Sequence, residues 1–172
     1  MFYKHVGLTL LEILVTLTII IVLLSLALTS YGEVISAHRP EFALKKLKRA
    51  LHLAKTQAAS SGNKTTLCHL ENQQCIDNAW HKKLTVFVDR GELRVLDGDD
   101  IRLHELSAIA PQDTIEYPRR AIIFNSDASI KGFTNGTFVY CLPIHQGVSD
   151  GLEMSVSNSG RARIRDTKKC PL

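Results

Sequence analysis

The sequence predicts an α+β protein, with one long N-terminal helix followed by a β-rich domain. Residues 8–28 are almost continuously apolar, and beyond Pro40 apolar residues recur at helical spacings of three and four. From residue 63 the apolar pattern changes to a period of two, which is typical of short strands. A length of 172 residues suits one modest domain plus an extra segment, and a hydrophobic content of 45% is enough for a buried core.

The apolar run begins close to the N-terminus. As a helix that rises about 1.5 Å per residue, residues 8–28 would extend roughly 30 Å, the thickness of a bilayer core. Lys4 precedes the run and, by the positive-inside rule, keeps this end in the cytoplasm. We therefore expect a single membrane-spanning helix, with the rest of the chain on the far side of the membrane.

One charged residue, Glu12, lies inside the apolar run. A carboxylate there costs about 2.5–3.5 kcal/mol on insertion scales, so its presence suggests a partner that neutralises it. The segment Gly7-Leu8-Thr9-Leu10-Leu11-Glu12 resembles the class III leader of type IV prepilins, although phenylalanine or methionine is more usual at the position of Leu8. The resemblance implies that a prepilin peptidase cuts after Gly7 and N-methylates Leu8, and that Glu12 then pairs with the amine of a neighbouring subunit during assembly.

Two other interpretations of the N-terminus are less favoured. An ordinary secretory signal would end near Ser25-Leu26-Ala27, but its apolar core would be too long and would contain a glutamate. A plain membrane anchor, in which Glu12 has no role, is the second alternative.

The helix should continue beyond the apolar run as a separate, amphipathic segment. Tyr31-Gly32 and Pro40 are expected to interrupt it. Pro40 should kink or restart the helix, because proline lacks an N–H and clashes with the preceding turn. An apolar stripe then repeats at helical spacing: Leu44, Leu47, Leu51, Ala54 and Ala58. The other faces carry cations, which we interpret as a solvated surface rather than a nucleic-acid site: Lys45, Lys46, Lys48, Arg49, His52 and Lys55. The helix should end near residues 60–63, where glycine and asparagine tolerate a left-handed cap.

Eight short strands are expected downstream, from their period-two pattern. They are Thr65–Leu70, Leu84–Asp89, Glu92–Leu96, Ile101–Glu105, Ala121–Phe124, Gly136–Leu142, Leu152–Val156 and Ala162–Arg165. Residues 89–92 and 97–100 have the composition of hairpin turns. The second also has oxygens for calcium, but it lacks the remaining ligands of an EF-hand loop, so a turn is favoured.

The four cysteines, Cys68, Cys75, Cys141 and Cys170, contain no CxxC motif and favour disulfides in an oxidising compartment. Three pairings are possible from the sequence alone. We expect Cys68–Cys75, which are close in the chain, and Cys141–Cys170, which would tie the C-terminal segment to a core strand. A zinc site at Cys68, His69 and Cys75 is less favoured, because only two sulfurs lie close together.

The order of motifs over nearly the whole chain is similar to the GspH/FimT family of type IV minor pilins and type II secretion pseudopilins. The matching segments are Thr66-Leu67-Cys68, Trp80, Val86-Phe87-Val88-Asp89, Ile122-Ile123-Phe124, Thr137-Phe138-Val139-Tyr140-Cys141, Ser157-Asn158-Ser159-Gly160-Arg161-Ala162-Arg163 and Cys170. The resemblance implies a type IV pilin-like fold, in which two antiparallel sheets pack around the C-terminal half of the helix. The expected organisation is a leader (1–7), an assembly helix (8–30), a periplasmic amphipathic helix (31–62) and a β-rich head with a basic tail (63–172).

The tail concentrates positive charge that the overall balance of 21 basic to 17 acidic residues does not reveal. Its cations are Arg161, Arg163, Arg165, Lys168 and Lys169. In an extended strand alternate residues share a face about 7 Å apart, so the three guanidinium groups can each grip a phosphate. Such contacts hold a nucleic-acid backbone without reading its sequence. The alternative is an edge strand whose charges prevent aggregation.

The resemblance adds weight to the nucleic-acid interpretation, since some FimT-like minor pilins bind DNA through a Gly-Arg-x-Arg tail during natural transformation. We therefore expect a minor pilin anchored in the bacterial inner membrane, with a periplasmic head, that enters a pilus and binds extracellular DNA. Its partners would be other pilins, the prepilin peptidase and DNA. The alternative is a structural pseudopilin of type II secretion, or a pilin that primes pilus assembly, without DNA binding. No catalytic motif is present, and we expect neither an enzyme nor a cofactor or metal.

Overall fold

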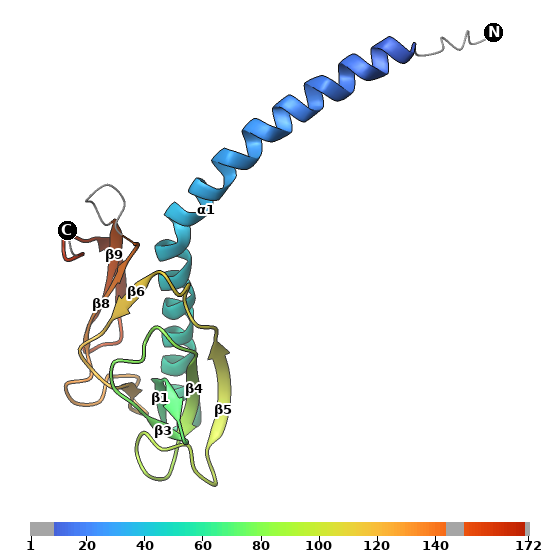
Figure 1. Ribbon diagram of the computed structural model, residues 1–172. Coiled ribbons are helices and arrows are strands. Elements are labelled where there is room, and N and C mark those ends of the chain that lie inside the picture. The colour runs from blue at the N-terminus through green and yellow to red at the C-terminus, as the bar shows by residue number, and fades with distance from the viewer. Residues whose placement is uncertain (1–8, 144–149, 171–172) are drawn as a thin grey trace, which may run out of the picture. The chain divides into compact units, whose positions relative to one another are not determined.

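The computed structural model describes residues 9–143 and 150–170, except for the side chains of residues 26–34. The predicted cleavage and methylation site at Gly7 and Leu8 lies outside the described residues. The chain forms two units, Met1–Arg39 and Pro40–Leu172, and the second unit is called the head below. Figure 1 shows the helix and the strands of the chain.

Helix α1 (Leu10–Ser61) begins at a threonine cap. The N–H of Glu12 donates to Oγ1 of Thr9 at 3.2 Å, which satisfies one of the free N–H groups of the first turn. The large apolar side chains at the start of the helix are exposed, for example Leu10 at 82% and Ile21 at 63%. Over the described residues, we find no helix with a stretch that is both long and apolar enough to cross a membrane.

The predicted interruption of the helix is wrong, because α1 continues through residues 31–32 and through Pro40. Proline removes one N–H from the helical ladder, and the helical turns on either side of it continue. Proline therefore marks the boundary between the two units without ending the helix. The C-terminus of α1 lies where it was expected: the N–H of Gly62, at φ +67°, donates to the carbonyl of Ala58 at 3.1 Å.

The predicted apolar stripe of the second half of α1 is the centre of the head. Leu44, Leu51, Ala54 and Ala58 are at most 2% exposed, and Leu47 is 3% exposed. These residues belong to one apolar cluster that includes side chains from both sheets of the head. Each fully buried leucine contributes roughly 1.5–3 kcal/mol of hydrophobic stabilisation, so the stripe holds the sheets to the helix.

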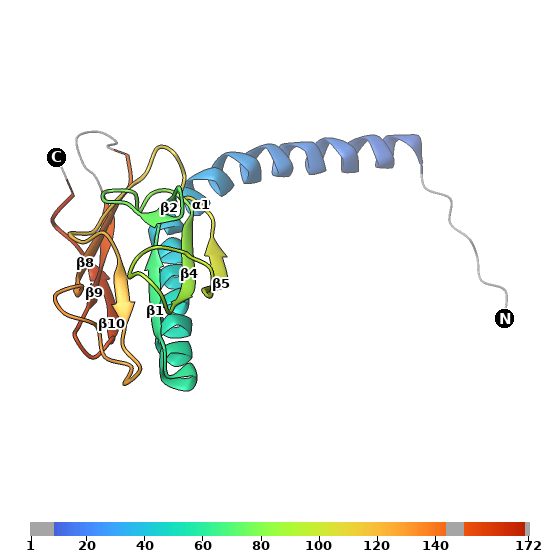
Figure 2. The same cartoon turned by 90° about the horizontal axis from the view of Figure 1, so that it is seen from below.

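Two four-stranded antiparallel sheets pack along this part of the helix, as the family resemblance implied (Figure 2). The first sheet has the order β5-β4-β1-β7, with β1 (Lys64–Cys68), β4 (Leu84–Asp89), β5 (Ile101–Leu106) and β7 (Ile122–Phe124). The second has the order β10-β9-β8-β6, with β6 (Thr114–Glu116), β8 (Gly136–Cys141), β9 (Gly151–Val156) and β10 (Ala162–Asp166). A small hairpin joins β2 (Leu70–Glu71) and β3 (Gln74–Cys75).

One predicted strand is absent, and the short strands β3 and β6 were not predicted. The predicted strand at residues 92–96 is a loop, and only Val95 forms an isolated bridge, to Gln74. Carboxylates capture its N–H groups instead: Asp89 accepts from the N–H of Arg94 at 2.9 Å, and Asp97 accepts from that of Glu92 at 3.2 Å. Because residues 92–96 are not a strand, β4 pairs instead with β5, across the loop between them. The predicted hairpin turn at residues 89–92 is therefore wrong. Strand β6 was missed because three residues are too few to show a period.

The turn at residues 97–100 is confirmed by a hydrogen bond of 2.9 Å from the N–H of Asp100 to the carbonyl of Asp97. The carboxylate of Asp100 accepts hydrogen bonds from the N–H groups of Arg90 and Asp97, at 2.7 and 3.2 Å. Side-chain oxygens here therefore serve the backbone of the loop.

Candidate nucleic-acid interface

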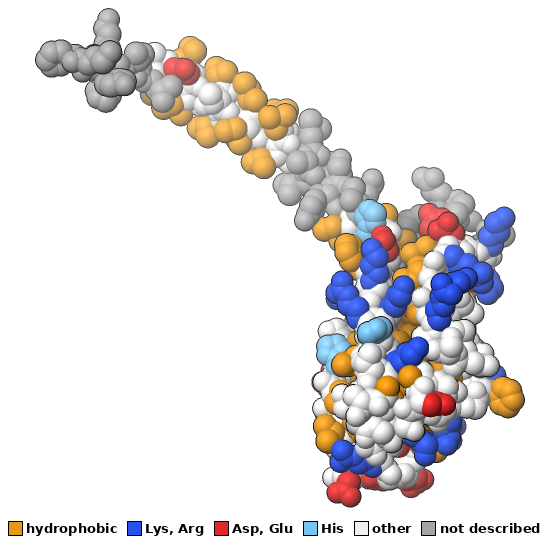
Figure 3. Space-filling view, turned by 180° about the vertical axis from the view of Figure 1, so that it is seen from behind, with side chains coloured by type: hydrophobic (Ala, Val, Ile, Leu, Met, Phe, Trp, Pro, Cys, Tyr) orange, Lys and Arg blue, Asp and Glu red, His pale blue; other side chains and the backbone are white. Residues whose placement is uncertain are grey.

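Strand β10 is an edge strand, paired only with β9. Ala162 and Ile164 pack against the core cluster, whereas Arg161, Arg163 and Arg165 are exposed. The predicted alternation is therefore present, and the three arginines point away from the core. Figure 3 shows two groups of Lys and Arg side chains in the upper part of one face of the head, with apolar side chains between them, and further Lys and Arg side chains toward its lower end.

A tight turn sets the start of this strand. The N–H of Gly160 donates to the carbonyl of Ser157 at 2.8 Å, and the N–H of Ser157 donates to the carbonyl of Arg161 at 3.1 Å. Gly160 has φ +72°, and a Cβ at this position would lie 2.6 Å from Cε1 of Phe124, so only glycine fits. Nζ of Lys55 donates to the carbonyl of Ser159 at 2.7 Å and fastens the turn to α1. The glycine and serines of the motif thus fix where Arg161 leaves the turn.

The residue that sequence reasoning missed is Glu153 of β9. It lies directly opposite Arg165 in the register, and its side chain is only 5% exposed. Its carboxylate forms an ion pair with Nε of Arg165 and accepts from Nζ of Lys169 at 2.9 Å and from Oγ1 of Thr167 at 3.1 Å. The hydrogen bond from Lys169, with those from Arg165 and Thr167, holds the pKa of Glu153 below its ordinary value despite its burial.

The chain after β10 folds back over the face of the sheet that is turned away from the core. Residues 167–170, called the strap below, reach from β10 across Glu153 to β8, where Cys170 forms a disulfide with Cys141. A Cβ on Gly151 would lie 2.5 Å from Sγ of Cys170, so the absence of a side chain there makes room for the disulfide. Both ends of the strap are therefore fixed.

The five predicted cations are consequently not equivalent. Arg165 and Lys169 are paired with Glu153. Within residues 9–143 and 150–170, the side chains of Arg161, Arg163 and Lys168 form no ion pair or hydrogen bond, and all three are exposed. Their donors are available to an external anion.

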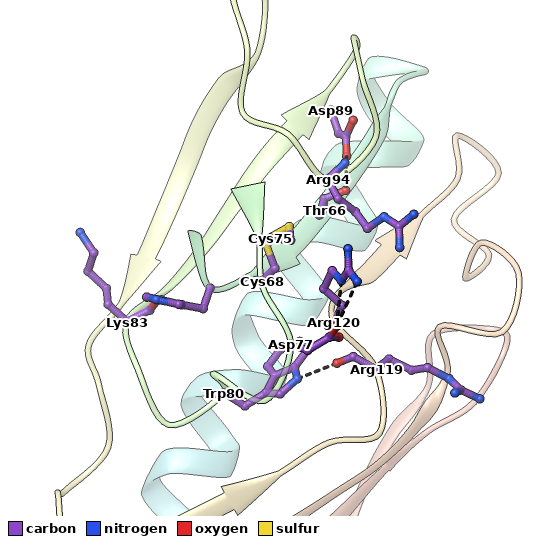
Figure 4. Close-up of a disulfide and its surroundings, with 11 residues drawn as sticks. Thr66, Cys68, Cys75, Asp77, Trp80, Lys83, Asp89, Arg94, Arg119 and Arg120 are labelled. Atoms are coloured by element: carbon purple, nitrogen blue, oxygen red, sulfur yellow. Dashed lines mark hydrogen bonds and ion pairs between the residues drawn. A yellow bond between two sulfur atoms is a disulfide. The ribbon is translucent and has the colours of Figure 1, made fainter. Parts of the chain in front are cut away.

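The second disulfide joins Cys68 and Cys75 (Figure 4). Both pairings are therefore those expected. The sulfurs of this pair are oxidised to a disulfide and are not available as zinc ligands, and Nδ1 of His69 lies 2.7 Å from the carbonyl of Lys83. Close by, Nε1 of Trp80 donates to the carbonyl of Arg119 at 2.7 Å, and Arg120 pairs with Asp77 at 3.0 Å. The side chains of this region therefore serve to hold the fold together.

The sequence of residues 43–160 matches the family model described as type II transport protein GspH. The chain belongs to the GspH family. This is a family of type IV minor pilins and pseudopilins. The GspH match ends at Gly160 and does not include the basic strand β10.

Solved structures with a similar fold include two crystal structures of the type IV minor pilin FimU from Pseudomonas aeruginosa strain PAO1. In space group P21 the TM-score is 0.57 at 16% identity, over 78% of this chain and 96% of that one. In space group P65 the TM-score is 0.55 at 18% identity, over 76% of this chain and 98% of that one. At 16–18% identity, the likeness to FimU establishes the fold of this GspH-family chain and does not establish its function. No curated protein sequence is significantly similar to it.

Proposed function

We propose that this protein is a minor type IV pilin that enters a pilus and binds extracellular DNA without sequence preference, for uptake in natural transformation. The observation that carries the DNA part of this proposal is the pair of exposed arginines, Arg161 and Arg163, which have no carboxylate partner among the described residues. Lys168 adds a third exposed cation, for which no ion pair is found within the part of the chain that the structure describes.

Phosphates are the natural ligands of such a surface. A guanidinium group offers two parallel N–H donors that fit a phosphate, and alternate residues of a strand place successive groups about 7 Å apart. The segment from Gly160 to Cys170 contains no aromatic residue, so base stacking cannot supply affinity there. Binding should therefore depend on charge, be independent of base sequence and weaken steeply with salt.

The assembly part of the proposal rests on the N-terminus. We place residues 8–30 in the inner membrane and residues 31–62 and 63–172 in the periplasm, before incorporation into the filament with other pilins. The exposed apolar side chains of the first turns of α1 support this placement. The hydroxyls of Thr16, Thr18 and Ser25 bond to carbonyls of their own helix at 2.8–2.9 Å, which lowers the cost of an apolar surrounding.

Leader processing is tested by N-terminal sequencing of the chain from a host with a prepilin peptidase. The mature chain should begin Leu-Thr-Leu-Leu-Glu, with a methylated Leu8. A terminus near Thr29, or an uncut chain, would remove the leader from the proposal.

DNA binding is tested with the full-length chain in a non-ionic detergent and a fluorescently labelled duplex, titrated at several salt concentrations. With about three phosphates contacted, the slope of log K against log salt should be near −3. The double variant Arg161→Gln/Arg163→Gln should flatten it by about two units. The matched control Arg102→Gln/Arg120→Gln removes two exposed arginines elsewhere on the head and should change the slope little. Equal effects of the two double variants would contradict a role of the tail.

The alternative is a structural pseudopilin of a type II secretion system, or a pilus-priming pilin, without DNA binding. It is favoured by the description of the matching family model as a type II transport protein, and by the end of that match before Arg161. A full-length chain that binds no DNA even at low salt would make this alternative the better one.

A further inference from the structure

A buried carboxylate lies beneath the basic surface. Glu153 is 4% exposed and belongs to the face of the sheet that is turned away from the core, with Val139 and Arg165 as its neighbours across the strands. A buried carboxylate is stable only when charged or polar donors surround it. Here every donor comes from the C-terminal segment that also carries the proposed DNA contacts.

Two of the tail cations are engaged by this carboxylate. Nε of Arg165 and Nζ of Lys169 both bond to the carboxylate, one to each oxygen, and Thr167 bonds to the oxygen that Lys169 uses. The side chains of Arg165 and Lys169 remain 65% and 58% exposed. Glu153 therefore orients them and partly neutralises their charge, while solvent can still reach them. A phosphate that binds either cation must compete with a carboxylate that is already in place.

Adjacent residues show the contrast. Lys168 and Lys169 are neighbours in the strap, yet only Lys169 is bonded to Glu153. Arg163 and Arg165 are exposed on the same face of β10, yet Arg163 lies opposite Ser155 and Arg165 lies opposite Glu153. The identity of the residue on β9 therefore decides which arginine is engaged.

We propose that Glu153 is an internal competitor of DNA phosphate, which holds Arg165 and Lys169 and leaves Arg161, Arg163 and Lys168 to bind DNA. The proposal rests on the proposed function, because it assigns roles within the same surface. It makes Glu153 a positioning residue that limits the number of phosphates contacted.

The first test is Glu153→Gln in the full-length chain in non-ionic detergent, with the same labelled duplex. The variant removes the negative charge and keeps the shape, so the salt slope should steepen by up to about two units and the affinity should rise. Glu116→Gln is the matched control: it removes an exposed carboxylate from β6 of the same sheet, for which no ion pair is found among the described residues. The control should change the slope little, and an effect equal to that of Glu153→Gln would overturn the proposal.

A second variant tests whether Arg165 and Lys169 contact DNA while the strap keeps its fold. In Glu153→Gln/Arg165→Gln/Lys169→Gln the whole network is neutral and still able to form hydrogen bonds, so the strap should stay closed. Its salt slope should be close to that of the natural chain. A loss as large as that of Arg161→Gln/Arg163→Gln would overturn the proposal, because it would place Arg165 and Lys169 in the DNA contact.

A third measurement needs no DNA and separates the two proposals. Labelling with an amine-reactive reagent, followed by peptide mapping, should modify Lys168 faster than Lys169. Glu153→Gln should raise the rate at Lys169 and leave Lys168 unchanged. Equal rates in the natural chain would overturn the role of Glu153 even if DNA binds. Unequal rates in a chain that binds no DNA would leave Glu153 as the partner of Lys169 and remove the proposed function alone.

Discussion

Among the residues that the structure describes, one strand of each sheet carries a buried carboxylate, Asp89 in β4 and Glu153 in β9, and these two carboxylates behave in opposite ways. Asp89 of β4 is 3% exposed and accepts from Oγ1 of Thr66 at 2.5 Å and from the N–H of Arg94 at 2.9 Å, both neutral donors (Figure 4). Burial raises its pKa above the ordinary 3.8. Glu153 of β9 is equally buried, but Lys169 and Arg165 lower its pKa below the ordinary 4.5. The pKa of a carboxylate in the fold therefore depends on the charge of its donors as well as on the desolvation that burial causes.

The largest effect is expected from the disulfide that closes the strap. Removing it with Cys141→Ser/Cys170→Ser should release the end of the strap that carries Lys169 and leave Arg165 of β10 as the cationic partner of Glu153. The two cysteines are 29 residues apart, so in the loop-entropy model the loss of stability is about 3–4 kcal/mol. Cys68→Ser/Cys75→Ser, with a separation of 7, should cost about 2–3 kcal/mol. Denaturant unfolding of the full-length chain measures both, and a larger loss from the shorter loop would contradict the prediction.

The next largest difference is expected when each carboxylate is replaced by alanine. Asp89→Ala should cost about 2–3 kcal/mol, because the hydroxyl of Thr66 and the N–H of Arg94 lose their acceptor inside the fold. Glu153→Ala should cost only about 1 kcal/mol, since Arg165 and Lys169 are more than half exposed and water can solvate them. The same unfolding experiment compares the two, and a greater loss at Glu153 would reverse the interpretation.

The pH dependence of stability should have two components of opposite sign. The pKa of Asp89 is raised in the folded state, so its ionised form lowers the stability of the fold. This loss of stability is relieved as the pH falls through the folded-state pKa toward the ordinary value of 3.8. Glu153 has a lowered pKa, so its contribution is complete above 4.5 and is lost as pH falls through its folded pKa. The groups that face them are Lys64 and Asp100 for Asp89, and Arg165 and Lys169 for Glu153.

Unfolding curves at a series of pH values test this. Asp89→Asn should remove the first component and Glu153→Gln the second. A Glu153→Gln variant that loses stability on acidification just as the natural chain does would show that other groups carry the second component.

The smallest effect on stability is expected at a third carboxylate, Glu12, which is exposed in the first turn of α1. Glu12→Ala should change the unfolding free energy of the head by less than about 0.5 kcal/mol. Incorporation into the filament, measured by immunoblotting of sheared pili, should nevertheless fall if Glu12 pairs with the amine of a neighbouring subunit, as the resemblance to type IV prepilins implies. Normal incorporation of the variant would argue against a role of Glu12 in assembly.

Local patterns predicted the parts of this molecule that local forces determine. The helical stripe and the alternation of Ile164 with its flanking arginines follow from periodicity. Glu153 was not predictable in this way, because in residues 152–156 it has the pattern of an outward, solvated residue. Its burial comes from the strap, which folds back only because Cys170 reaches Cys141. Residues 92–96 failed for a different reason: carboxylates five residues away in the chain accept from their N–H groups and override a strand-like pattern.

The closed strap also determines how the edge strand carries a mechanical load. An edge strand pulled from a free end unzips one hydrogen-bonded pair at a time. Strand β10 has no such end: the turn at Gly160 joins it to β9, and beyond Asp166 the disulfide joins the chain covalently to β8, an inner strand of the sheet. A force applied to Arg161 or Arg163 is therefore transmitted to β9 through the turn and to β8 through the disulfide, and the disulfide holds the C-terminal side of the strand against peeling.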